Sequence, residues 1–81
     1  MIYMDAVGHL VSDTNFDELH SFAAGIGLKR EWFQDKRLPH YDLTTNRKRV
    51  QALYAGAKLC STRDIIRKMK KQEGVTKEST I

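Results

Sequence analysis

The histidine and aspartate side chains of this sequence are the groups best suited to bind a metal ion or a polar ligand, since imidazole nitrogens and carboxylate oxygens both coordinate divalent cations. His40 and Asp42 are two residues apart, which places both side chains on one face if the segment is a β-strand. The other candidates are His9, His20, Asp5 and Asp13. Their spacing matches no metal-binding signature such as H-E-x-x-H or paired cysteines, so we expect no metal and no cofactor. We assign the histidines to hydrogen bonds or to a ligand, and expect His20 to be partly buried.

Motifs for nucleophilic catalysis are missing from the sequence. Cys60 is the only cysteine and has no evident base, and there is no G-x-S-x-G motif. Neither standard phosphate-binding loop occurs, since the motifs G-x-x-x-x-G-K-[ST] and G-x-G-x-x-G are both absent. Gly25-Ile26-Gly27 is placed to end a helix, whereas the glycines of a dinucleotide-binding loop begin one. We therefore expect a binding protein rather than an enzyme, with no catalytic residue.

Hydroxyl and basic side chains at residues 44–49 predict a place where an anion binds. Thr44 or Thr45 caps the start of a helix, and Arg47, Lys48 and Arg49 follow directly. A helix start presents unpaired backbone amides and a partial positive charge, which favour phosphate or carboxylate. The net charge of +4 also favours anionic partners. The alternative for the hydroxyl residues is ordinary capping of a helix. The alternative for the basic residues, above all those at residues 63–71, is a helix face exposed to solvent.

Two adjacent aromatic residues, Trp32 and Phe33, cannot both face the same core, so we expect one of them to be exposed. An exposed aromatic side chain near cations can stack on a nucleobase, and burial against a neighbouring helix is the alternative. Tyr41 raises the same question, because it alternates with His40 and Asp42 along an expected strand.

The elements that must position these residues alternate between strand and helix. Strands are expected at residues 2–11, as one strand or as two joined at residues 6–8, and at residues 40–43 and 58–60. Residues 28–37 fit either a turn of helix or a short edge strand.

Helices are expected from Thr14 to Gly27, from Thr44 or Thr45 to Gly56, and from residue 61 onward. The apolar side chains expected to face inward are, in these three helices, Phe16, Leu19, Phe22, Ala23 and Ile26; Val50, Leu53, Tyr54 and Ala57; and Ile65, Ile66 and Met69.

The order β-α-β-α-β-α predicts an α/β fold with a short, mostly parallel sheet and helices packed on it. Ligands bind outside the carboxyl ends of the strands in open sheets of this kind. The strand ends that we expect to converge at one edge carry Ser12-Asp13-Thr14, then Asp42 with Thr44-Thr45-Asn46, and Ser61-Thr62.

A length of 81 residues suits one domain, expected at residues 1–73 with a polar tail at residues 74–81. Because so short a chain buries a small core, we expect a homo-oligomer. A single cysteine excludes a disulfide within one chain and favours a reducing interior. The opening MIYMDAVGHL has no basic region or long apolar run, and no later segment approaches the roughly 20 apolar residues of a membrane span. We expect a cytoplasmic protein with no membrane partner.

Several short motifs occur together in a fixed order along the chain. They are His9-Leu10-Val11-Ser12-Asp13-Thr14, Glu18-Leu19-His20-Ser21-Phe22-Ala23, Ile26-Gly27-Leu28, Trp32-Phe33-Gln34, His40-Tyr41-Asp42-Leu43-Thr44 and Ala55-Gly56-Ala57. Over residues 1 to about 66 the chain thereby resembles the small bacterial and phage family catalogued as the domain of unknown function 4031. The resemblance supports the fold and implies no activity. Its recurrent polar and aromatic positions correspond here to His9, Trp32, Phe33, His40, Tyr41, Asp42 and residues 47–49.

The leading hypothesis is a non-enzymatic, oligomeric binder of a small anionic ligand. That ligand would be phosphorylated, for instance a cyclic nucleotide, and the protein a phage counter-defence sponge that sequesters a signalling nucleotide in the host cytoplasm. The residues expected to bind it are His9, Trp32, Phe33, His40, Tyr41, Asp42, Thr44, Thr45, Arg47, Lys48 and Arg49.

Two alternatives stay open. One is a metal-dependent phosphodiesterase or nuclease that uses Asp5, Asp13, His40 and Asp42. The other is a nucleic-acid-binding protein that uses the helices beginning near Arg47 and Arg63, with mostly phosphate-driven contacts.

Overall fold

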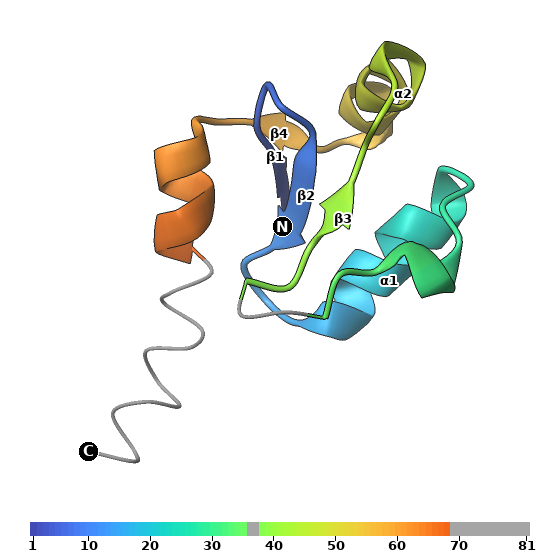
Figure 1. Ribbon diagram of the computed structural model, residues 1–81, viewed down its shortest axis with the longest axis horizontal. Helices are drawn as coiled ribbons and strands as arrows, with labels where there is room; N and C mark the ends of the chain where they lie inside the picture. The colour runs from blue at the N-terminus through green and yellow to red at the C-terminus, as the bar shows by residue number, and fades with distance from the viewer. Residues whose placement is uncertain (36–37, 69–81) are drawn as a thin grey trace.

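The computed structural model describes residues 1–35 and 38–68 (Figure 1). Its elements, in chain order, are β1 (Ile2–Met4), β2 (His9–Ser12), α1 (Phe16–Gly25), the short 3-10 helix η1 (Arg30–Trp32), β3 (Tyr41–Asp42), α2 (Asn46–Ala55), β4 (Lys58–Leu59) and a helix over residues 62–68. This arrangement confirms the α/β class. No helix within the described ranges is long and apolar enough to cross a membrane.

The four strands form one mixed sheet in the order β3-β2-β1-β4. β2 pairs antiparallel with both β1 and β3, and only β1 and β4 are parallel. The prediction of a mostly parallel sheet is therefore wrong. The reason is the first connection: residues 5–8 are far too few for a parallel crossover, which needs a dozen or more residues, so β1 and β2 form a hairpin. The alternative of two short strands joined at residues 6–8 is confirmed.

Gly8 makes this hairpin possible. Its amide donates to the carbonyl of Asp5 at 3.1 Å, and its φ of 108° is a conformation that residues with a Cβ rarely adopt. A Cβ at this position would also lie 2.4 Å from the carbonyl oxygen of Leu43. The hairpin can therefore lie close against the end of β3.

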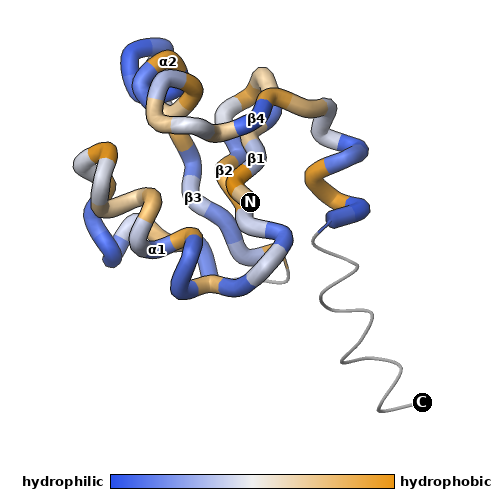
Figure 2. The backbone as a smooth tube through the Cα atoms, turned by 180° about the vertical axis from the view of Figure 1, so that it is seen from behind, coloured by the Kyte–Doolittle hydropathy of each residue, from blue (hydrophilic) through white to orange (hydrophobic). Residues whose placement is uncertain are grey.

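The helices cover both faces of the sheet, so the domain has three layers. α1 and α2 pack on one face, where Met4, Leu10 and Leu19 belong to the larger core cluster. The helix over residues 62–68 covers the other face, where Ile65 packs with Val11. Figures 1 and 2 show α1 and this last helix on opposite sides of the strands from two directions.

The helix boundaries follow the expected signals with one correction. α1 is capped by Asn15, whose side chain accepts from the amide of Glu18, and not by the predicted Thr14. α2 is capped by Thr45 and ends at Gly56, which has a left-handed φ of 117°. Both Asn and Thr can cap a helix, and the choice between neighbours depends on where the strand before α1 ends.

Three of the four residues predicted to face inward from α2 are exposed, and only Ala57 is buried as predicted. Val50 and Leu53 are 42% and 40% exposed, and Tyr54 is 89% exposed. The buried residue of this helix is Ala52, with Ala57 buried just after it. α2 and the residue after it thus contribute small side chains, Ala52 and Ala57, to the larger core cluster. The predicted inward residue Met69 and the predicted tail lie outside the described residues.

Candidate functional site

Strand directions decide which polar residues meet at one edge of the sheet. β1, β3 and β4 run in the same direction and β2 runs in the opposite one. The start of β2 at His9 therefore lies beside the ends of the other three strands. The predicted contribution of Ser12-Asp13-Thr14 to this edge is wrong, because the end of β2 lies at the opposite edge. There Asp13 accepts from the N-terminal ammonium group at 2.9 Å.

The carboxylate of Asp5, at the end of β1, is completely buried in the structure. Its Oδ1 accepts from the backbone amides of Gly8 and His9, at 2.8 and 2.9 Å. Its Oδ2 accepts from the hydroxyl of Thr62 and faces Nδ1 of His9, both at 2.7 Å. Burial by itself would raise the pKa of Asp5, but the hydrogen bonds from these donors outweigh it and lower the pKa to about 2.

His9 is held in one orientation by this carboxylate. An ionised carboxylate can only accept, so Nδ1 of His9 carries the hydrogen and Nε2 is the acceptor in the neutral ring. His9 is the direct cross-strand partner of Asp42. Its Nε2 lies 3.9 Å from Oδ1 of that residue.

His40 approaches the same carboxylate from the segment before β3. Its Nδ1 lies 2.5 Å from the carbonyl oxygen of Leu38, which again can only accept. Its Nε2 lies 3.2 Å from Oδ1 of Asp42. The rings of His9 and His40 meet edge to face, with centroids 5.2 Å apart. The predicted placement of His40 and Asp42 on one face is thus confirmed, with His9 as their neighbour.

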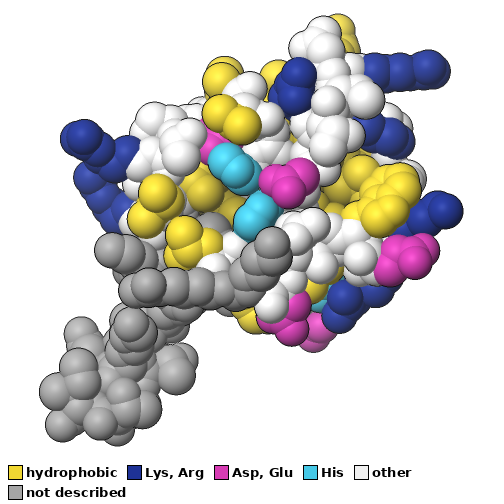
Figure 3. All heavy atoms as spheres, viewed as in Figure 1, with side chains coloured by type: hydrophobic (Ala, Val, Ile, Leu, Met, Phe, Trp, Pro, Cys, Tyr) yellow, Lys and Arg dark blue, Asp and Glu magenta, His cyan; other side chains and the backbone are white. Residues whose placement is uncertain are grey.

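His9, His40 and Asp42 together form the His/Asp cluster. One ligand atom from each lies within 4.8 Å of the other two, and within the described part of the chain this is the group able to hold a metal ion. Figure 3 shows histidine and acidic side chains side by side near the middle of one face of the molecule.

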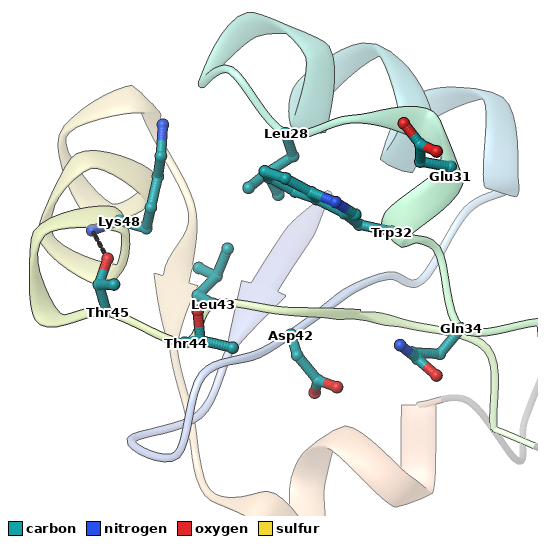
Figure 4. A pocket seen from close by; sticks show the side chains of 9 residues that line it. All are labelled: Leu28, Glu31, Trp32, Gln34, Asp42, Leu43, Thr44, Thr45 and Lys48. Carbon is teal, nitrogen blue, oxygen red and sulfur yellow. Dashed lines mark hydrogen bonds between the residues drawn. The ribbon is translucent and has the colours of Figure 1, made fainter.

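A pocket of about 530 Å³ adjoins the cluster. It lies between η1, the end of β3 and the start of α2 (Figure 4). Its lining residues are Leu28, Glu31, Trp32, Gln34, Asp42, Leu43, Thr44, Thr45 and Lys48. Asp42 belongs to both the cluster and the pocket. The two features therefore form one continuous candidate site.

Trp32 provides the aromatic wall of the pocket and is 46% exposed. Phe33 is half-buried and packs on the rings of His20 and Tyr41, at 4.6 and 5.3 Å between centroids. The expectation that only one of the two adjacent aromatics is exposed is confirmed.

Tyr41 lies in the core and not in the pocket, with 1% of its surface exposed. Its hydroxyl group lies 2.8 Å from Nδ1 of His20. Burial, with a smaller contribution from the charge of Arg30, lowers the pKa of His20. Tyr41 and His20 thus form a polar pair at the core. The expectation that His20 is partly buried is confirmed.

Two of the three predicted anion-binding basic residues are bound to backbone carbonyls. Nζ of Lys48 donates to the carbonyl of Ile26 at 2.6 Å, close to the end of α1. Arg49 donates to the carbonyls of Leu43 and Val7, at 2.8 and 3.4 Å. Arg47 is exposed to solvent. Lys48 and Arg49 thus connect α2 to neighbouring loops, and Arg47 is the one of the three best placed to attract an anion.

Sequence reasoning missed the roles of Asp5, Thr62 and the carbonyl of Leu38 in holding the two histidines. One local signal was available for Asp5, since an aspartate three residues before a glycine is typical of a turn in which the carboxylate accepts backbone amides. No local signal pointed to Thr62, which is 57 residues away from Asp5 in the chain.

Comparison with known proteins gives one match. The model of a family described as "Protein of unknown function (DUF4031)" matches residues 3–72. No curated protein and no solved structure matches the chain.

Proposed function

The chain belongs to the DUF4031 family, whose description names no function, and from the geometry of its pocket we propose that the protein binds a small anionic ligand with a planar ring, a nucleotide. Catalysis is not required by this proposal. A role that suits such a binder is sequestration of a signalling nucleotide, such as a cyclic nucleotide, by a cytoplasmic homo-oligomer in the manner of a phage counter-defence sponge.

The observation that carries the proposal is the half-exposed indole of Trp32 on a pocket of about 530 Å³. Small-molecule sites commonly have volumes of about 300–1,000 Å³, so a mononucleotide fits in size. Stacking of a base on an aromatic side chain contributes about 1–3 kcal/mol, which makes an exposed indole in a concave site valuable for binding.

The other lining groups suit the polar parts of a nucleotide. The amide of Gln34 and the carboxylate of Asp42 can hydrogen-bond to the edge of a base or to ribose hydroxyls. Thr44 and Thr45 precede the first turn of α2, whose backbone amides and partial positive charge favour a phosphate group. The exposed side chain of Arg47 in this turn adds a full positive charge.

The single tryptophan makes the test direct, because Trp32 reports on its own pocket by fluorescence. Nucleoside monophosphates, diphosphates and cyclic nucleotides are titrated against the purified protein, with inorganic phosphate as the ring-free control. We expect saturable quenching by at least one nucleotide and, by native mass spectrometry, a bound mass that is recovered intact after denaturation.

Two variants separate stacking from general effects. Trp32→Leu is expected to weaken nucleotide binding about tenfold or more, as the loss of a stacked base implies. Tyr54→Leu changes an aromatic that is 89% exposed on α2 and outside the pocket, and should leave affinity unchanged.

Other outcomes would contradict the proposal in distinct ways. No quenching and no bound mass at millimolar nucleotide would remove the pocket as a nucleotide site. Conversion of the nucleotide during incubation would show hydrolysis rather than sequestration. Tight binding of oligonucleotides that falls steeply with salt would identify a nucleic-acid-binding protein.

A further inference from the structure

The two imidazoles of the His/Asp cluster have fixed tautomers. Nδ1 of His9 is bound to the carboxylate of Asp5 and Nδ1 of His40 to the carbonyl of Leu38. Both partners are acceptors, so each Nδ1 holds the ring hydrogen and each neutral ring keeps a lone pair on Nε2.

The two Nε2 atoms lie 3.9 and 3.2 Å from Oδ1 of Asp42. When both rings are neutral, the cluster brings two imidazole nitrogens and one carboxylate together, all of them acceptors. One divalent cation would satisfy all three groups at once.

We propose that His9 and His40, each through Nε2, and Asp42, through its carboxylate, bind a divalent transition-metal ion, with Zn²⁺ preferred. Imidazole ligands favour Zn²⁺ and its neighbours over Mg²⁺, which prefers oxygen ligands and retains its water. Three protein ligands leave at least one coordination position of the ion open to water or to a ligand.

The distances fit a site that closes slightly around the ion. Ligand atoms on one tetrahedral Zn²⁺ lie about 3.4 Å apart, given bonds of about 2.0–2.1 Å. The present atoms lie within 4.8 Å of one another, so the widest separation must shrink by rotation of side chains. Asp42, with 44% of its side chain exposed, can turn toward the ion, and the two rings, 33% and 19% exposed, need only tilt about their Nδ1 hydrogen bonds.

The surroundings of the cluster match the usual support of a metal-binding histidine. Such residues donate the second ring nitrogen to a carboxylate or a backbone carbonyl, which orients the ring and raises its basicity. Asp5 supplies the carboxylate for His9 and Leu38 the carbonyl for His40. Asp5 is completely buried and anchored by Thr62 and two backbone amides, so it positions His9 and is not itself a ligand.

The test uses Zn²⁺ alone, without nucleotide, so its result is independent of the proposed ligand. Calorimetric titration is expected to show one ion bound per chain. Imidazole ¹⁵N spectra of the same sample should show large shifts of Nε2 in His9 and His40, with the signals of His20 unchanged. Absence of saturable Zn²⁺ binding, or shifts that spare either His9 or His40, would overturn the assignment.

A matched pair of variants tests the ligand set. Asp42→Asn removes an exposed carboxylate of the cluster and is expected to weaken Zn²⁺ binding at least tenfold. Asp13→Asn removes an exposed carboxylate at the opposite edge of the sheet and should bind like the wild type. Equal affinity of Asp42→Asn and wild type would rule out the proposed site.

Two further controls address other sources of binding. Cys60→Ser removes the single thiol, which could otherwise hold Zn²⁺, and should leave the affinity unchanged; a loss of tenfold or more would move the site away from the cluster. Mg²⁺ is expected to bind at least tenfold more weakly than Zn²⁺. Equal affinity for the two ions would contradict ligation by imidazole.

Discussion

Oδ2 of Asp5 lies 2.7 Å from Nδ1 of His9 and also 2.7 Å from the hydroxyl of Thr62. One buried carboxylate thus connects the first hairpin of the chain to the start of the helix over residues 62–68. The same contacts set the orientation of His9 toward Asp42. Stability and site geometry therefore depend on the same group.

Replacing Asp5 with asparagine is expected to lower the free energy of unfolding by roughly 3 kcal/mol. The asparagine side chain has one acceptor oxygen in place of two, so some of the donors that now bond to the buried carboxylate would lose their partner. Urea denaturation followed by circular dichroism measures this difference. Asp13→Asn, which changes an exposed carboxylate paired with the N-terminus, should cost no more than about 1 kcal/mol. Equal effects of the two variants would show that the buried contacts contribute little.

Acid should destabilise the protein through Asp5. Its pKa is about 2 in the folded protein against an ordinary value of 3.8, so the unfolded chain binds the proton first as the pH falls. The stability contributed by the ionised group is complete above about pH 4 and is lost as the pH falls toward 2. The free energy of unfolding of wild type should drop across this window more steeply than that of Asp5→Asn. Parallel curves for the two proteins would show that the pKa of Asp5 is not lowered.

Gly8→Ala should destabilise the fold by about 1–3 kcal/mol, since a residue with a Cβ is strained at positive φ. The new Cβ would also lie 2.4 Å from the carbonyl oxygen of Leu43, so the hairpin must move. Gly25→Ala is the control, because nothing lies within 4 Å of its Cβ position at the end of α1. There alanine should be neutral or mildly stabilising. Thermal melts that ranked the two variants the other way would disprove the role of Gly8.

Variants of Arg47 and Arg49 are expected to have different effects, the first on nucleotide affinity and the second on the free energy of unfolding. Arg49→Met removes two hydrogen bonds to backbone carbonyls and should cost about 1–2 kcal/mol of stability while leaving the pocket accessible. Arg47→Met removes an exposed charge and should weaken nucleotide binding with little change in stability. Fluorescence titration and urea denaturation of both variants measure the two effects. Nucleotide affinity that is unaffected by Arg47→Met would remove this residue from the site.

If the proposed metal and nucleotide share the site, Zn²⁺ should raise nucleotide affinity about tenfold, since an open coordination position can accept a phosphate oxygen. Asp42→Asn should abolish this enhancement by metal. Fluorescence titrations with Zn²⁺ and with a chelator provide the comparison. Equal nucleotide affinity with and without the ion would show that the two ligands bind independently.

Local sequence signals were enough for the elements and for some of the site. Thr45 and Gly56 mark the ends of α2 because capping involves only neighbouring backbone groups. His40 and Asp42 share a face because side chains alternate along any strand. The exposure of either Trp32 or Phe33 followed from the same geometry.

Tertiary structure decided which of these residues meet. The sequence alone determined an α/β chain with polar residues near the ends of its strands, since those features depend on nearby residues. The direction of β2, which places Asp13 at the opposite edge, follows from the short connection after β1. Its pairing with β3, which is distant in the chain, brought His9 to Asp42. The burial of Tyr41 and the bond from Thr62 to Asp5 likewise arise only when the layers pack. Contacts between distant residues are set by packing of the whole chain, and no local pattern records them.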